Sequence, residues 1–242
     1  MGALSVRLGP AHVTFTDRHG GVSATPFDTA NLGLHTDDAR DRVFENRRRL
    51  ATTLAPAGVT ADPDNWVWLR QVHGADVADV DAPPPTVPEV DAAVTRTPRL
   101  PLVVLTADCA PIALASDEAV AVVHAGWPGL LAGVIEAAVE QLRAKSSGPV
   151  RAALGPCIHP ARYEFGPADL DMVATRLGES VRARTETDRP ALDIPGAVRA
   201  ALGRVDVKDL IDCGVCTSAS PDHFSYRRDG PTGRQAVVAF LT

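Results

Sequence analysis

The chain has 242 residues, of which 45% are hydrophobic, and its formal net charge at pH 7 is -6. This length is enough for a sizeable core, and we expect one domain over residues 1–242. The acidic balance excludes nucleic acid as a general partner, because a phosphate backbone binds to a concentrated basic surface, and no stretch approaches the ~18 apolar residues that cross a membrane.

Taken along the chain, hydrophobic periodicity predicts a mixed α/β protein. Helices are predicted where apolar residues recur every three or four positions, and strands where short runs are rich in branched residues. Four prolines at positions 83, 84, 85 and 88 indicate a surface connector, because proline stiffens the chain and donates no hydrogen bond to a sheet. The predicted order is helix 43–54, strand 65–69, connector 83–88, strands 102–105, 112–115 and 120–123, helix 130–144, strand 151–154, helices 169–177 and 194–202, and strands 208–211 and 235–241.

The segment from Pro101 to His124 reads as strand, loop, strand, tight turn and strand, which puts His124 at a strand end. Gly126 and Gly129 are expected in the turn that follows. Pro128 is expected near the start of the next helix, where the missing N–H of proline is tolerated. Polar groups at strand ends that face a helix N-terminus are typical of sites that favour anions.

Three short stretches carry candidate metal ligands: Gln71-Val-His-Gly74, Thr106-Ala-Asp-Cys109 and His124-Ala-Gly-Trp127. Two imidazoles and one thiolate supply three corners of tetrahedral zinc and leave the fourth for water, as in catalytic sites. Read alone, each histidine is also consistent with a surface hydrogen-bonding residue, and Cys109 with a small buried hydrophobe. The neighbouring glycines favour the joint interpretation, because the backbone can approach a ligand closely there.

Other polar residues leave alternatives open. Asp108 is a proton carrier, a partner of the ligands, or a turn-capping residue. The pair Cys213 and Cys216 is a structural zinc site, a redox pair or two reduced thiols, and reduced thiols are favoured because no second C-x-x-C completes a zinc site. Cys157, after strand 151–154, is a nucleophile or, as we favour, a buried thiol in a turn. The basic segment 224–234, which contains Arg227 and Arg228, is a ligand contact or a solvated face.

The ordered motifs resemble the YfiH-type family. These motifs are Gln71-Val-His-Gly74, Thr106-Ala-Asp-Cys-Ala-Pro111, His124-Ala-Gly-Trp-Pro-Gly129, Gly155-Pro-Cys-Ile158 and Phe224-Ser-Tyr-Arg-Arg-Asp-Gly230 with Gly233-Arg234. The family was long labelled multicopper polyphenol oxidase or laccase-domain proteins and is associated with purine nucleoside phosphorylase and adenosine deaminase activity. The likeness runs from Asn31 to the C-terminus.

The resemblance implies a single α/β domain with a mixed β-sheet core and outer helices. It implies that His73, Cys109 and His124 are the zinc ligands, with copper as the alternative metal. It also matches Asn31 to a position that contacts the nucleoside and Arg47 to one that contacts phosphate.

Two positions depart from the family pattern. Pro128 stands where the family usually has arginine, so a phosphate role of that arginine is lost or taken over by Arg47, Arg70, Arg227 or Arg228. His159 stands where the family often has glycine, and we expect it to narrow the pocket.

The favoured hypothesis is a cytoplasmic zinc enzyme, monomeric or a small homo-oligomer, in which phosphate attacks the anomeric carbon of adenosine, inosine, guanosine or methylthioadenosine. Zinc-activated water could also deaminate adenosine. A copper polyphenol oxidase is the first alternative, although a multicopper centre needs many histidines in His-x-His pairs and this chain has seven histidines and no such pair. A cell-wall precursor editing hydrolase with Cys109 as nucleophile and a non-catalytic binding protein are the others.

Overall fold

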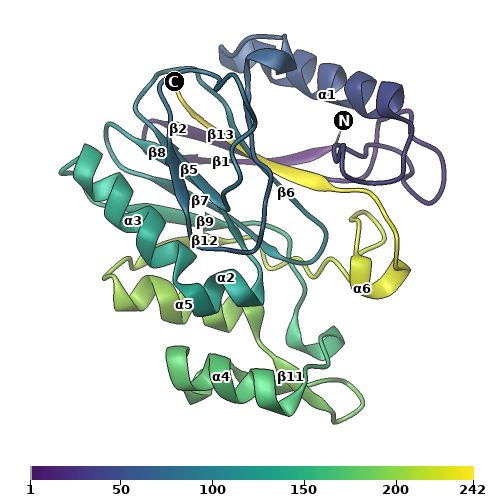
Figure 1. Ribbon diagram of the computed structural model, residues 1–242, viewed down its shortest axis with the longest axis vertical. Coiled ribbons are helices and arrows are strands. Elements are labelled where there is room, and N and C mark those ends of the chain that lie inside the picture. Colours follow the sequence, from purple (N-terminus) through teal and green to yellow (C-terminus); the bar gives the residue numbers. More distant parts are fainter. Residues whose placement is uncertain (1) are drawn as a thin grey trace.

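Two β-sheets stacked face to face form the centre of the molecule, and helices cover both outer faces (Figure 1). The computed structural model describes residues 2–242. One sheet has the order β1 (Ala3–Leu8), β2 (Ala11–Thr16), β13 (Gln235–Leu241), β6 (Leu102–Thr106) and β3 (Val67–Trp68). The other has the order β12 (Asp209–Asp212), β9 (Arg151–Leu154), β7 (Ala110–Ala115), β8 (Val120–Ala125), β5 (Ala92–Thr95) and β4 (Val77–Asp79).

The remaining elements lie outside these sheets. A small separate sheet pairs β10 (Arg182–Arg184) with β11 (Pro190–Leu192). The α-helices are α1 (Arg40–Leu54), α2 (Trp127–Ala132), α3 (Val134–Lys145), α4 (Pro167–Leu177), α5 (Ile194–Arg204) and α6 (Tyr226–Asp229). Four short 3₁₀ turns cover Ala55–Ala57, Pro63–Asn65, Pro160–Arg162 and Glu179–Val181. No helix within residues 2–242 has the length and apolar character to cross a membrane.

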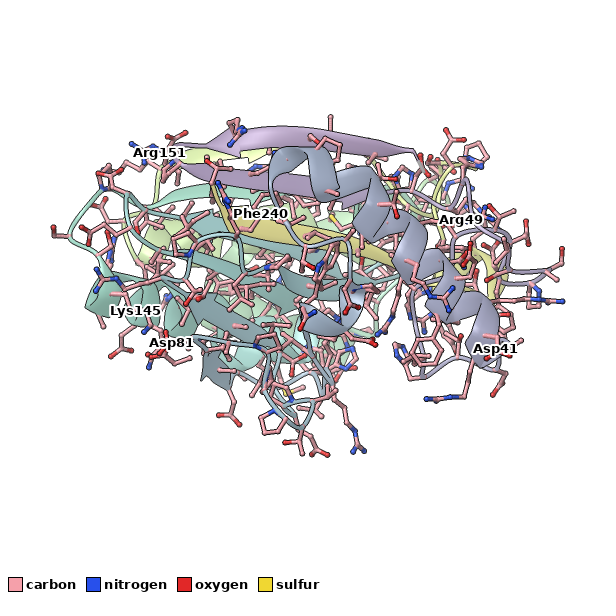
Figure 2. All side chains as sticks on the ribbon, turned by 90° about the horizontal axis from the view of Figure 1, so that it is seen from above. Asp41, Arg49, Asp81, Lys145, Arg151 and Phe240 are labelled. Carbon is pink, nitrogen blue, oxygen red and sulfur yellow. The ribbon has the colours of Figure 1, made fainter. Side chains whose placement is uncertain are left out.

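Three apolar layers hold the architecture together, and β6 contributes to two of them. Leu102 and Val104 face the layer between the sheets, whereas Val103 and Leu105 face the layer under α1. Successive side chains of a strand point to opposite faces, so a strand buried on both faces is apolar throughout. Figure 2 looks onto α1, with Asp41 and Arg49 along the helix and Phe240 of β13 in the layer beneath.

The third and largest apolar layer lies between the six-stranded sheet and helices α2 to α5. Here the helix predicted over residues 130–144 is wrong as a single element, because the structure has two helices that meet at Gly133. Gly133 has φ of +91° and caps α2 by donating its N–H to the carbonyls of Gly129 and Leu130. Glycine adopts this left-handed conformation without steric cost, so it ends one helix and lets the next start at a new angle.

The predicted strands after residue 100 are all present, β12 with its range shifted by one residue. The strand predicted over residues 65–69 is shorter, because Asp62 caps a turn at Pro63–Asn65 by accepting a hydrogen bond from the Asp64 N–H. Strands β1, β2, β4, β5, β10 and β11 were not predicted. The expected fold class, a single α/β domain with mixed sheets and outer helices, is confirmed.

Candidate metal centre

Strand register brings Cys109 and His124 to the same end of the six-stranded sheet. Antiparallel pairing of β7 with β8 matches Ala110 with Ala125, so Cys109 comes opposite Gly126. His124 follows Val120 and Val122 on the face toward the other sheet, and both valines belong to the layer between the sheets. The candidate centre therefore lies at one end of the inter-sheet layer.

His73 completes the group from the loop after β3. The ligand atoms of His73, Cys109 and His124 all lie within 4.8 Å of one another, and the Cys109 Sγ to His73 Nε2 distance is 3.8 Å. Tetrahedral zinc holds such atoms about 3.3 to 3.6 Å apart, so small side-chain rotations are enough to enclose an ion. His124 is buried, Cys109 is half-buried and His73 is exposed, which leaves one side of the group open to solvent.

Gly126 keeps the space between the ligands free. A Cβ at this position would lie 2.6 Å from Cδ2 of His73 and 3.1 Å from Sγ of Cys109. Both contacts are closer than van der Waals distance, so any side chain at residue 126 would displace a candidate ligand. The residues present therefore fit a metal ion in both donor chemistry and space.

Asp91, which sequence reasoning missed, connects two of the three candidate ligands. Its buried carboxylate accepts hydrogen bonds from the backbone N–H groups of Val72, His73 and Gly74 at 3.1, 2.9 and 2.7 Å. Nδ1 of His124 donates to the same carboxylate at 2.7 Å, which leaves Nε2 of His124 free to bind an ion. The one signal in the sequence is an acidic residue directly before the apolar strand β5.

The protonation of Asp91 follows from these contacts. Burial alone would raise the pKa of its carboxyl, but the hydrogen bond from His124 and those from the backbone N–H groups outweigh burial and lower the pKa. The carboxylate is therefore ionised at neutral pH. The loop that it holds includes His73 at φ of +60°, a conformation that non-glycine residues rarely adopt without support.

Gln71 fastens the same loop to the other sheet. Its side-chain amide donates to the carbonyl of Leu105 at 2.6 Å, and its side-chain oxygen accepts from the Leu105 N–H at 2.8 Å. These two bonds continue the parallel pairing of β3 with β6 through a side chain. The loop that carries His73 is thus held between the two sheets.

Cys109 and His124 form a charged pair. Burial raises the pKa of the Cys109 thiol, but the charge of His124 and hydrogen bonds with both histidines outweigh burial and lower it to about 6. Burial lowers the pKa of His124, but the Cys109 thiolate and the Asp91 carboxylate raise it to about 9. Thiolate is the form of cysteine that binds metals, and an ion would take the place of the imidazolium proton.

Asp108 uses its carboxylate to hold the C-terminal segment. The two oxygens accept from the Thr217 hydroxyl at 2.6 Å and from the Arg227 backbone N–H at 2.7 Å. Asp108 has φ of +104°, and its own carbonyl accepts from the Ile158 N–H at 2.8 Å. The residue thereby fixes the turn that presents Cys109.

Asn31 joins the segment that follows it to the start of β13, and its side chain makes its full set of hydrogen bonds. Its amide nitrogen donates to Thr36 and Asp38, and its oxygen accepts from the backbone N–H groups of Gly33 and Arg234. Asn31 is completely buried. It therefore shapes the loop after residue 31 and has no free group for a ligand.

The three arginines predicted to bind substrate differ in how many of their guanidinium nitrogens are already hydrogen-bonded to the protein. Arg47 is buried, lies 3.6 Å over the Trp68 ring and donates twice to the Leu32 carbonyl. Arg227 lies 4.6 Å over the Tyr163 ring and donates to the Glu164 carbonyl. Arg228 has all its nitrogens engaged: it donates to the carbonyls of Thr217, Ser220 and His223 and to both carboxylate oxygens of Asp229.

Aromatic side chains form one wall next to the candidate centre. Trp127 begins α2 directly after Gly126, and its ring meets the Phe165 ring edge-on at 5.5 Å. Tyr163 lies 5.4 Å from the same ring. Beyond Phe165 and Arg227 the surface is hollowed by about 580 Å³, with Arg189 also in the lining. Tyr163 and Phe165 carry no recognisable motif, so sequence reasoning missed them.

The remaining sequence candidates lie elsewhere. The structure has four free cysteines, and Cys157 is buried beside Cys216, whose sulfur accepts from the His159 N–H at 3.3 Å. Within residues 2–242, the triad is the one group of three or more metal-binding side chains close enough to share an ion. Pro128 occupies the first turn of α2, as predicted.

The fold and the site together define an α/β protein with two stacked sheets and an open centre of two histidines and one cysteine. The chain belongs to the family described as multi-copper polyphenol oxidoreductase laccase, whose match covers residues 12–242.

Named relatives agree with this assignment. The chain is 44% identical to a protein of Streptomyces coelicolor named purine nucleoside phosphorylase, with 96% of each chain covered. It is 38% identical to YfiH of Shigella flexneri, which bears the same name, over 93% of this chain and 91% of that one. The solved structure of YlmD from Geobacillus stearothermophilus superposes with a TM-score of 0.85 at 31% identity, covering 96% and 92% of the two chains. The resemblance to the YfiH-type family is confirmed, and the Streptomyces and Shigella relatives carry the name of an enzyme.

Proposed function

We propose that this protein is a zinc-dependent purine nucleoside phosphorylase. The observation that carries the proposal is the open group of His73, Cys109 and His124, backed by Asp91, in a chain whose full-length relatives are named purine nucleoside phosphorylase. The substrates would be adenosine, inosine, guanosine or methylthioadenosine together with phosphate. A cytoplasmic location and a monomer or small homo-oligomer remain predictions of the sequence.

Zinc is favoured over copper by the donor set. Two imidazoles and one thiolate with a fourth position open to solvent match catalytic zinc sites, whereas multicopper chemistry needs further ligand groups. When bound, the ion would supply a Lewis acid that polarises an oxygen of phosphate, of the sugar or of water.

The protein's own residues would bind and orient the nucleoside around this centre. The aromatic wall of Trp127, Tyr163 and Phe165 offers faces and edges against which a purine can pack. Burial raises the pKa of Tyr163 to about 12, so its hydroxyl stays protonated and can donate a hydrogen bond to the base. Asp91 would keep His124 in the tautomer that directs Nε2 to the ion.

An assay with defined metal content tests the proposal. Zinc-loaded protein is incubated with each nucleoside, with and without phosphate, and the products are separated by chromatography. We expect free base only when phosphate is present, and no product from His73→Ala. His19→Ala is the matched control, because His19 lies on the surface, where it pairs with Asp222.

The same assay separates the alternatives. Inosine formed from adenosine without phosphate would indicate adenosine deaminase activity in the same site. Phenol oxidation by copper-loaded protein faster than any nucleoside turnover would favour the oxidase that the family description names. Absence of all turnover, with a melting temperature that falls on chelation, would favour a binding protein whose metal stabilises the fold. A cell-wall precursor hydrolase would act without phosphate and depend on the Cys109 thiolate alone.

A further inference from the structure

Three nitrogen-bearing side chains converge on the backbone of Leu32 and Gly33. Arg47 donates from Nε and Nη2 to the Leu32 carbonyl at 3.0 and 2.9 Å. A Cβ on Gly33 would lie 2.9 Å from Cγ of Arg234 and 3.3 Å from Cε1 of His35. Glycine at position 33 therefore lets Arg234 and His35 close on the same short segment.

Sheet register places this cluster next to the metal centre. Antiparallel pairing of β13 with β6 matches Gln235 with Thr106, so Arg234 leaves its strand where the chain of β6 turns toward Cys109. Burial lowers the pKa of Arg234, and the negative charges of Cys109 and Asp108 partly offset the effect of burial. The cluster and the candidate ligands thus share one end of the molecule.

Arg234 differs from Arg228 in how many of its guanidinium nitrogens make hydrogen bonds within the protein. All three nitrogens of Arg228 donate to protein oxygens. Arg234 donates only from Nη1, to the carbonyls of Thr232 and Gly233 at 2.9 Å each. Within residues 2–242 its Nε and Nη2 make no hydrogen bond, and this edge is one of the two donor forks with which guanidinium binds oxyanions bidentately.

Arg47 and His35 add donors of different kinds. The Nε and Nη2 edge of Arg47 is used by Leu32, which leaves Nη1 available. Burial lowers the pKa of His35, and the charges of Arg234, Arg47 and His124 lower it further, so the imidazole is neutral at pH 7. It would contribute a hydrogen bond and no charge.

We propose that Arg234, with Nη1 of Arg47 and the imidazole of His35 beside it, binds the phosphate co-substrate at the edge of the metal centre. This inference rests on the proposed function, which makes phosphate a substrate. We call Arg234, Arg47 and His35 the phosphate cradle. Asn31 is a positioning residue of the cradle, because its side-chain oxygen accepts from the backbone N–H groups of Gly33 at 3.0 Å and Arg234 at 2.9 Å. Its own side chain does not touch the anion.

The test measures phosphate binding separately from turnover. Zinc-loaded wild type, Arg234→Gln, Arg234→Lys and His35→Gln are titrated with inorganic phosphate by calorimetry without nucleoside, and the KM values for phosphate and nucleoside are measured in parallel. We expect Arg234→Gln to weaken phosphate binding and raise the phosphate KM about tenfold or more. Arg234→Lys keeps the positive charge and loses the paired donors, so its phosphate affinity should lie between those of wild type and Arg234→Gln. The nucleoside KM should change by less than about twofold in both Arg234 variants.

Arg48→Gln is the matched control, because Arg48 lies exposed on the same helix as Arg47 and pairs only with Glu45. An equal loss of phosphate binding in this control would overturn the inference, since the effect would then be one of net charge. Unchanged phosphate affinity in an Arg234→Gln protein that keeps its zinc and its melting temperature would also overturn it. Should Arg234→Gln fail to fold, unchanged phosphate affinity in both Arg234→Lys and His35→Gln would have the same meaning.

The two proposals fail in different ways. If wild type binds phosphate through Arg234 but cleaves no nucleoside, the proposed function is wrong and the phosphate cradle stands. If wild type cleaves nucleosides with phosphate and Arg234→Gln keeps its phosphate KM, the function stands and the cradle is wrong.

Discussion

The carboxylate of Asp91 accepts a 2.7 Å hydrogen bond from Nδ1 of His124 while it also accepts the backbone N–H of His73 at 2.9 Å. One buried acid therefore sets the ring orientation of one candidate ligand and the loop position of another. The residue lies outside every motif from which the metal site was predicted, yet two of the three ligands depend on it.

Replacement of this acid should weaken the metal site. In Asp91→Asn the amide cannot accept all four hydrogen bonds, so we expect zinc affinity to fall about 10- to 100-fold and the free energy of unfolding to fall by about 3 kcal/mol. Competition with a chelator measures the first and denaturant titration the second. Asp79→Asn is the control, since Asp79 is exposed and pairs with Lys145. Equal zinc affinity in the two variants would contradict the role given to Asp91.

Loss of any candidate ligand should remove the ion. We expect about one zinc per chain in the purified protein and loss of that zinc in His73→Ala, Cys109→Ser and His124→Ala, because an open site has only three protein ligands. Cys213→Ser should retain zinc, because Cys213 is outside the group. Elemental analysis after gel filtration measures both results, and retention of zinc by the three ligand variants would refute the site.

A methyl group added at Gly126 should weaken zinc binding, because it would displace a candidate ligand. In Gly126→Ala the new Cβ would lie 2.6 Å from the His73 ring, so the ring must move and zinc affinity should fall at least about tenfold. Gly203→Ala is the counterpart, because a Cβ there meets nothing within 4 Å and the position is in α5. We expect it to keep zinc and to stabilise the protein by about 0.5 to 1 kcal/mol. Chelator competition and thermal melting of both variants check the pair.

Position 128 tests whether a positive charge added at the start of α2 strengthens phosphate binding. Pro128 lies in the first turn of α2, two residues after Gly126. The side chain of an arginine at this position would therefore start close to the candidate metal ligands. We expect Pro128→Arg to lower the phosphate KM about tenfold, as one charge-assisted contact would. A phosphate KM that stays the same or rises would indicate that Arg234 already supplies enough charge for phosphate or that proline is needed to start the helix.

Local patterns were sufficient for most of the central strands and for the existence of the main helices. The apolar run of β6 and the branched run of β13 identify strands whatever their neighbours are, because few other arrangements bury them. β5 was missed because Ala92 and Ala93 have little intrinsic preference for strands. The break at Gly133 was missed because glycine is also tolerated within helices, and only the packing of α2 and α3 requires its positive φ.

The sequence by itself determined the fold class, the family and the three residues most suited to bind a metal, since donor chemistry and glycine neighbours are local properties. Tertiary structure alone decided what completes the site. Asp91 reaches His124 across 33 positions, and Asn31 reaches Arg234 across 203. It also decided which arginines are free, because Arg228 and Arg234 look alike in sequence and differ only in how many protein oxygens surround them. Hydrogen bonds between distant segments form only after the sheets have set their register, so no local pattern records them.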